Sequence, residues 1–139
     1  MMFLLDSNVV SELRSAKRCD PMVKKWESKN ALSDCWISVI TLLESRRGID
    51  QIARKDLVFA EILERWFREK VKPSFLRKTL PVSSEIAERA GEILAMRTRG
   101  LADCLIAATA LEHRLTLVTR NAADFEDVKG LKILNPWKG

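Results

Sequence analysis

Short apolar segments that alternate with helical patterns constrain the fold of this chain more than any other feature of its sequence. Five segments have the length and composition of buried strands: residues 2–5, 35–39, 79–82, 115–118 and 131–134. Strands separated by helices in this way favour a parallel sheet that is covered by helices on both faces. The sequence therefore predicts an α/β fold, a three-layer α/β/α domain around a central, mainly parallel sheet.

The stretches between these segments carry the start and stop signals of helices. The expected helices cover residues 9–13, 21–29, 41–47, 51–70, 84–97 and 102–114. Ser7 or Asn8 is the expected cap of the first helix, and Pro21 stands at the first position of the second. Gly48 is expected to end the third helix and Pro73 to break the fourth. Helices and strands thus alternate along most of the chain.

Composition limits the class of protein. The chain has 139 residues, 47% hydrophobic and 31% charged, which is typical of one soluble globular domain spanning residues 1–139. No run of about eighteen apolar residues occurs, and Asp6 interrupts the apolar start, so neither a membrane span nor a signal peptide is expected. Three cysteines without a CxxC pair predict reduced, partly buried thiols in a cytoplasmic protein.

The charge balance favours an anionic partner. The net charge is +5 and the pI is near 9.3. Basic residues recur in pairs, such as Lys24 with Lys25 and Arg46 with Arg47, and each pair alone is typical of a solvated helix face. Their sum favours nucleic acid over an acidic protein or a membrane surface.

Four acidic residues share one kind of position in the predicted fold. Asp6 ends the first strand, and Glu44 lies on the helix after the second. Asp103 begins the helix before the fourth strand, and Asp124 follows that strand. Taken singly, Asp103 is an ordinary first-turn acid and Asp124 an ordinary turn residue. Together, at one sheet edge, four carboxylates would raise one another's pKa and would need a cation to stay ionised.

Oxygen ligands of this kind suit Mg²⁺ or Mn²⁺, which keep several waters when bound. Such a metal can activate a water to attack a phosphodiester, and a second metal can stabilise the leaving oxygen. A zinc site is not expected, because the single histidine, His113, has no paired histidine or cysteine at ligand spacing. His113 is interpreted as a surface or packing residue.

Four segments resemble the signature segments of the PIN-domain ribonucleases, and within them the VapC-type toxins of bacterial toxin and antitoxin pairs. The segments are FLLDSNVVSEL, ISVITLLE, LADCLIAATA and LTLVTRNAADF, and NPW near the end matches the usual Asn-Pro finish of the family. They span almost the whole chain and are specific as a set. The resemblance implies a PIN-like α/β/α domain.

The same resemblance implies a site, a metal and partners. The implied metal-binding and catalytic acids are Asp6, Glu44, Asp103 and Asp124, and the implied polar rim consists of Ser7, Asn8, Thr119 and Asn121. Family members cleave RNA endonucleolytically with Mg²⁺ or Mn²⁺ and pair as homodimers. An antitoxin holds them inactive by laying its C-terminal segment in a groove over the site.

Aromatic residues support the antitoxin groove only weakly. The candidates are Trp26, Trp36, Trp66 and Phe67. At helical or strand spacing such side chains belong to the core more often than to an interface, although interfaces are also enriched in them.

One departure from the family lies just before Asp103. Family members usually carry a longer loop there, whereas this chain has only residues 97–102 between the preceding helix and the acid. The tight link could shift Asp103 by about one helical turn, roughly 5.4 Å. The preceding helix could instead end early and leave the site intact, which is the interpretation we favour, or the protein could be a degenerate, weakly active member.

Two other functions compete with an endoribonuclease. A non-catalytic module could use the acidic pocket only to grip an arginine of a partner, or to bind RNA without cutting it. A phosphatase of the haloacid dehalogenase type also begins with a strand-end Asp, but it needs a second Asp two residues later, where this chain has Asn8.

Overall fold

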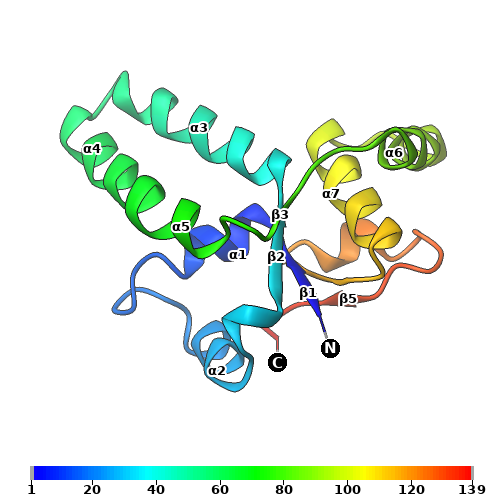
Figure 1. Cartoon of the computed structure of the whole chain (residues 1–139), viewed down its shortest axis with the longest axis horizontal. Coiled ribbons are helices and arrows are strands. Elements are labelled where there is room, and N and C mark those ends of the chain that lie inside the picture. Colours follow the sequence, from blue (N-terminus) through cyan, green and yellow to red (C-terminus); the bar gives the residue numbers. More distant parts are fainter. Residues whose placement is uncertain (1, 139) are drawn as a thin grey trace.

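A parallel sheet forms the centre of the fold (Figure 1). The structure, a computed structural model, describes residues 2–138. Within them five strands pair in the order β3-β2-β1-β4-β5, and each pairing is parallel. The strands are β1 (Phe3–Leu5), β2 (Cys35–Ser38), β3 (Thr79–Leu80), β4 (Thr116–Val118) and β5 (Ile133–Leu134). The predicted sheet is confirmed.

Helices cover both faces of this sheet (Figure 1). They are α1 (Ser7–Glu12), α2 (Pro21–Lys29), α3 (Val39–Ala53), α4 (Leu57–Trp66), α5 (Lys72–Ser74), α6 (Ser84–Met96) and α7 (Leu101–Glu112), with short turns η1 (Leu32–Asp34), η2 (Phe67–Val71) and η3 (Ala122–Phe125). Leu4 packs with Ile106 of α7 in one core, whereas Leu5 packs with Val9 of α1 in the other. Successive residues of β1 thus enter opposite cores, as the alternation of a strand requires. The predicted three layers are confirmed.

The helix predicted to end at Gly48 continues past it. Ser38 caps α3 by accepting a hydrogen bond from the backbone of Ile40 (3.0 Å), and the helix runs on to Ala53. Glycine in a helix interior costs only about 1 kcal/mol relative to alanine. Ile49, the next residue, is 5% exposed in the core, and its burial outweighs that cost. Gly48 is therefore an interior residue, and the predicted stop is wrong.

The long helix predicted over residues 51–70 is divided into two. Its first residues belong to α3, and α4 begins after Asp56, whose carboxylate accepts a hydrogen bond from the backbone of Phe59 (3.0 Å). An N-cap aspartate of this kind starts a helix wherever its backbone is extended. Helices α3 and α4 therefore form an antiparallel hairpin on one side of the molecule (Figure 1).

Pro73 does not end the helical path where the sequence predicts. The turn η2 is a π-turn, closed by a hydrogen bond from the backbone of Lys72 to the carbonyl of Phe67. The wider turn places Pro73 in the first turn of α5, where its missing N–H leaves no bond unmade. The helical path therefore continues to Ser74.

Other predictions differ by one or two residues at the ends of elements. Val39 begins α3 instead of ending β2, and α6 ends at Met96. Cys35 and Cys104 are buried free thiols, and Cys19 is partly buried. Within residues 2–138, none of the helices combines the length and the apolar character needed to cross a membrane.

Candidate acidic site

Asp6 is held at the carboxyl end of β1. Its backbone N–H donates to the carbonyl of Val118 in β4 (2.9 Å), so the sheet itself places the residue. Its carboxylate accepts one hydrogen bond from the backbone of Ser7 (2.7 Å) and one from the hydroxyl of Thr119 (2.7 Å). Asp6, rather than the predicted Ser7 or Asn8, is therefore the N-cap of α1. The side chain is almost inaccessible, with Asp6 4% exposed.

The predicted rim residues connect α1 to the turn after β4. The Thr119 hydroxyl accepts from the backbone of Asn121 (3.1 Å) and from the amide of Asn8 (3.5 Å). The Asn8 side-chain oxygen accepts from the backbone of Arg120 (3.3 Å). These bonds bring Asn8 and Thr119 together beside Asp6, whereas Asn121 takes part through its backbone.

Ser7 brings Glu44 of α3 to the same place. Its hydroxyl donates to Glu44 Oε1 (2.5 Å) and lies 3.3 Å from the hydroxyl of Thr41. Thr41 is fully buried and was not predicted as part of the site. Its signal in the sequence is its position three residues before Glu44, which places both side chains on one face of a helix.

Asp103 and Asp124, the other two predicted acids, lie close to each other. Asp103 lies in the first turn of α7, and its carboxylate folds back toward the helix start, because a Cβ added to Gly100 would lie 3.2 Å from Asp103 Oδ2. Asp124 is an exposed residue of η3. The two acids line one small pocket together with Arg97 and Arg99. The short link thus leads into α7 with Asp103 beside Asp124, and the charge of Glu44 still influences Asp103.

The acids influence one another's ionisation. Burial raises the pKa of Asp6 to about 6, the hydrogen bonds from Thr119 and Ser7 oppose this rise, and the charges of Asp103 and Glu44 add to it. Burial also raises the pKa of Asp103, and the charges of Glu44 and Asp124 raise it further. All four predicted acids therefore belong to one electrostatic cluster, in which like charges resist joint ionisation.

The donor atoms of the cluster suit a hard cation, but its side chains do not lie close enough together to form a complete metal site. Its donors are carboxylate oxygens, which Mg²⁺ and Mn²⁺ prefer. Among the side chains of residues 2–138, no group of three or more His, Cys, Asp or Glu is already close enough to hold a metal ion. Burial is the main cause of the raised pKa values of Asp6 and Asp103, and a bound cation would offset the repulsion between the acids that raises them further.

Other predicted features lie outside this cluster. His113 is the exposed C-cap residue of α7, in agreement with its interpretation as a surface residue. Phe67 is 3% exposed in the core that contains Leu5, and Trp36 packs against the core that contains Leu4. Trp26 and Trp66 line an apolar groove with Leu13. Two of the four aromatic residues are therefore core residues, and two are placed where a partner could touch them.

Comparison with known proteins identifies the family. The PIN domain profile matches residues 3–131. VapC ribonuclease Y4jK from Sinorhizobium fredii is 31% identical over 99% of both chains. Toxin FitB from Neisseria gonorrhoeae is 33% identical, over 98% of this chain and 99% of its own.

Solved structures agree with this match. FitAcB from Neisseria gonorrhoeae superposes with a TM-score of 0.86 at 29% identity, covering 98% of this chain and 99% of the other. DNA-bound VapBC from Salmonella typhimurium superposes with a TM-score of 0.77 at 26% identity, covering 98% of each chain. The sheet, the strand-end acids and these similarities lead to one conclusion: the chain belongs to the PIN-domain family, as one of its VapC-type members.

Proposed function

We propose that this protein is a metal-dependent endoribonuclease and the toxin of a toxin and antitoxin pair. The observation that carries the proposal is the acidic cluster at the carboxyl ends of β1 and β4, where Asp6 is buried and its pKa is raised to about 6 in the neighbourhood of Asp103 and Glu44. The names of the relatives, a VapC ribonuclease and a toxin, support the same activity. The product would be a 5′-phosphate and a 3′-hydroxyl.

Each acid has a separate role in this proposal. Asp6 and Asp103 would hold the principal Mg²⁺ or Mn²⁺, Glu44 would ligate it or orient water, and Asp124 would support a second metal or the waters of the first. When bound, the metal supplies an activated water and stabilises developing charge. The Thr119 hydroxyl orients the Asp6 carboxylate, and the Ser7 hydroxyl orients that of Glu44.

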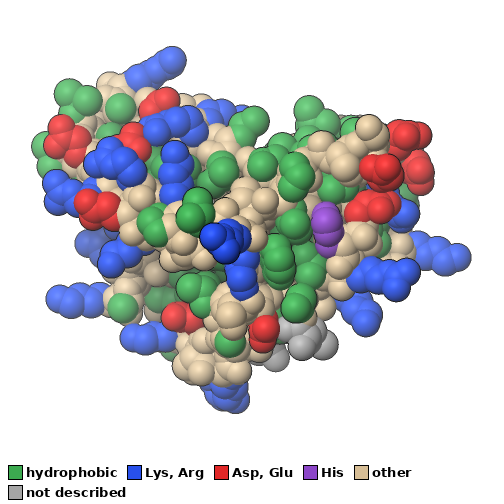
Figure 2. All heavy atoms as spheres, in the orientation of Figure 1, with side chains coloured by type: hydrophobic (Ala, Val, Ile, Leu, Met, Phe, Trp, Pro, Cys, Tyr) green, Lys and Arg blue, Asp and Glu red, His purple; other side chains and the backbone are tan. Residues whose placement is uncertain are grey.

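Basic side chains would position the RNA. On the face that Figure 2 shows, Lys and Arg side chains lie over α3 and α4 with some acidic ones among them, and acidic side chains gather over α6. Contacts from arginine and lysine to phosphates set the position of a nucleic acid without reading its sequence. This distribution supports RNA as the substrate.

An antitoxin and a second copy of the chain are the proposed protein partners. The similar structure from Klebsiella pneumoniae is a toxin-antitoxin complex, with 28% identity and a TM-score of 0.65. The apolar groove lined by Leu13, Trp26 and Trp66 would receive part of the antitoxin. Homodimer formation follows only from membership of the family and is proposed on that basis.

The test is cleavage of RNA by the purified protein without its partner. We expect cutting that depends on added Mn²⁺ or Mg²⁺, and we expect Asp6→Asn to reduce it by at least ~100-fold. Asp56→Asn is the matched control, because Asp56 is also an N-cap aspartate but starts α4, outside the cluster. Full activity in Asp6→Asn would remove the metal mechanism from consideration.

A catalytically inactive binding module is the second candidate. The observation in its favour is that Asp6 and Glu44 already accept hydrogen bonds from Thr119 and Ser7. Binding of RNA or antitoxin without cutting, together with no measurable affinity for Mn²⁺, would establish it.

A further inference from the structure

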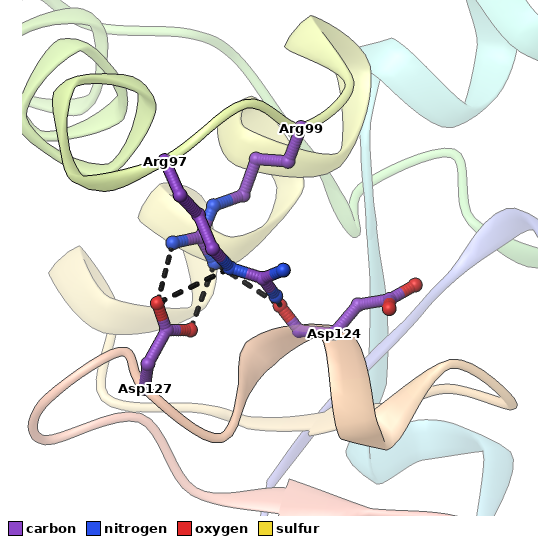
Figure 3. A network of polar contacts seen from close by, with 4 residues as sticks. All are labelled: Arg97, Arg99, Asp124 and Asp127. Carbon is purple, nitrogen blue, oxygen red and sulfur yellow. Dashed lines mark hydrogen bonds and ion pairs between the residues drawn. The ribbon is translucent and has the colours of Figure 1, made fainter.

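Two arginines of the link between α6 and α7 grip the turn that carries Asp124 (Figure 3). Arg99 binds the Asp127 carboxylate through both of its terminal nitrogens, at 3.0 and 2.7 Å. The carbonyl of Asp124 accepts from Arg97 (2.7 Å) and from Arg99 (3.0 Å). Arg97 also forms an ion pair with Asp127 (3.3 Å). We call this set of four residues the arginine clamp.

Burial makes Arg99 the anchor of the clamp. Its side chain is 6% exposed, compared with 48% for Arg97 and 40% for Asp127. The Nε atom of Arg99 is buried and has no hydrogen-bond partner among residues 2–138. A side chain in which one buried donor is left unpaired is not optimised for stability alone, since the unpaired group costs free energy.

The clamp leaves the acid itself free. Both arginines bind the backbone carbonyl of Asp124, and Figure 3 shows the Asp124 carboxylate pointing away from them. Phe125, the next residue, is 1% exposed and anchors the same turn in the core. The backbone of Asp124 is therefore fixed on both sides while its carboxylate remains available.

The clamp also connects the two acids that share a pocket. Arg97 and Arg99 immediately precede the start of α7, where Asp103 lies, and the pocket is lined by both arginines and both acids. Two carboxylates on separate elements repel each other, and this repulsion favours a wider spacing between them. A positively charged link bound to the turn ties their backbones together against this repulsion.

We propose that Arg99, with Arg97 and Asp127, is a positioning residue that holds Asp124 and the start of α7 at the spacing needed for metal binding. This inference rests on the proposed function, because it assigns the clamp to the same acidic cluster. It also gives the short link between α6 and α7 a role, since Arg97 and Arg99 of this link hold the turn.

The experiment compares three single variants and one double variant with the unaltered protein. Arg99→Lys keeps the charge but loses the two-point grip, and Asp127→Asn removes the carboxylate that receives it. Arg89→Gln is the matched control, because the Arg89–Glu112 ion pair (2.9 Å) also joins α6 to α7 but contacts none of the four acids. The measurements are Mn²⁺ affinity by titration calorimetry, kcat and KM for RNA cleavage, and Tm.

We expect Arg99→Lys and Asp127→Asn each to weaken Mn²⁺ binding by roughly 10-fold and to lower kcat more than they raise KM. Their double variant should be little worse than either alone, since both break one interaction. Arg89→Gln should lower Tm by about as much as Arg99→Lys and Asp127→Asn do, but it should leave Mn²⁺ affinity unchanged.

Unchanged Mn²⁺ affinity in Arg99→Lys and Asp127→Asn, or an equal loss in Arg89→Gln, would overturn the inference while the proposed function stands. Absence of both Mn²⁺ binding and RNA cleavage in the unaltered protein would overturn the proposed function, and the inference with it.

Discussion

Asp6 combines two properties that oppose each other, since it is an acid and it is almost inaccessible to water. The sheet places its backbone, and Thr119 and Ser7 donate hydrogen bonds to its carboxylate, yet its pKa is still raised to about 6. Burial therefore outweighs the two hydrogen bonds in this position. A group kept in a state that the fold disfavours is a candidate for function rather than for stability.

Replacing Asp6 by asparagine should stabilise the metal-free protein at neutral pH. A rise of the pKa from 3.8 to about 6 corresponds to roughly 3 kcal/mol of destabilisation once the group is ionised. The free energy of unfolding of Asp6→Asn should rise by less than this, about 1 kcal/mol, because the asparagine amide keeps only part of the hydrogen bonding to Ser7 and Thr119. Urea unfolding of both proteins in a metal chelator at pH 7.5 measures the difference.

The raised pKa of Asp6 also predicts how the free energy of unfolding changes with pH. Because the pKa of Asp6 is higher in the fold than in the unfolded chain, the folded protein binds more protons between about pH 4 and pH 6. The free energy of unfolding should therefore fall as the pH rises through that window, and the fall should be smaller in Asp6→Asn. A steeper fall in the variant would contradict the assignment of the raised pKa to Asp6.

At the scale of elements, the start of α7 decides where Asp103 points. Gly100 caps this helix without a side-chain hydrogen bond and has φ −65° and ψ 139°, which any residue can adopt. Its lack of a side chain matters for space, since a Cβ there would lie 3.2 Å from Asp103 Oδ2. The glycine thus leaves room for the carboxylate rather than supplying a special backbone conformation.

Gly100→Ala should move the Asp103 carboxylate by a few tenths of an ångström and weaken Mn²⁺ binding a few-fold, roughly 0.5–1 kcal/mol. Stability should change little, because the backbone of Gly100 is compatible with alanine. Titration calorimetry and Tm measure the two effects. Gly48→Ala is the control, since a Cβ at that position would meet no atom within 4 Å; a loss of Mn²⁺ affinity there would count against the steric explanation.

Helices and strands could be predicted from the sequence where residues close to their ends mark them. Asp6 and Thr119 follow apolar runs, and Ser83 caps α6 as expected, so these strand ends and this cap could be located from neighbouring residues, whereas the cap of α1 is Asp6 and not the predicted Ser7 or Asn8. The π-turn before Pro73 could not be located in this way, because the tertiary contacts of Phe67 and Val71 hold it.

The candidate site shows the same limit. Asp6, Asp103 and Asp124 could be named in advance because each lies near the end or the start of an element, whereas Glu44 lies inside α3 and was named from its place on the helix after the second strand. The contact between Ser7 and Glu44 spans 37 positions, and the bond from Arg99 to Asp127 spans 28, so neither leaves a local signal. Topology predicted that Asp6 would feel the charges of Glu44 and Asp103, as it does, but the contacts that hold these acids in place could not be predicted.

At the scale of the whole molecule, charge is distributed unevenly. The chain carries 24 basic and 19 acidic residues, yet four of its acids lie in one cluster at the edge of the sheet. The basic excess would attract the backbone of the proposed RNA substrate, whereas the cluster would repel its phosphates. A cation at the cluster would remove this conflict and let a phosphodiester approach the acids.

Binding of Mn²⁺ should therefore stabilise the fold as a whole. A ligand that binds only the folded state adds about 2.7 kcal/mol when its concentration is 100 times its Kd. For a domain of this size we expect Tm to rise by roughly 10 °C. The rise should vanish in Asp6→Asn and persist in Asp56→Asn, because Asp56 starts α4 outside the cluster. Differential scanning calorimetry across a Mn²⁺ series measures it, and an equal rise in Asp6→Asn would place the bound cation elsewhere on the surface.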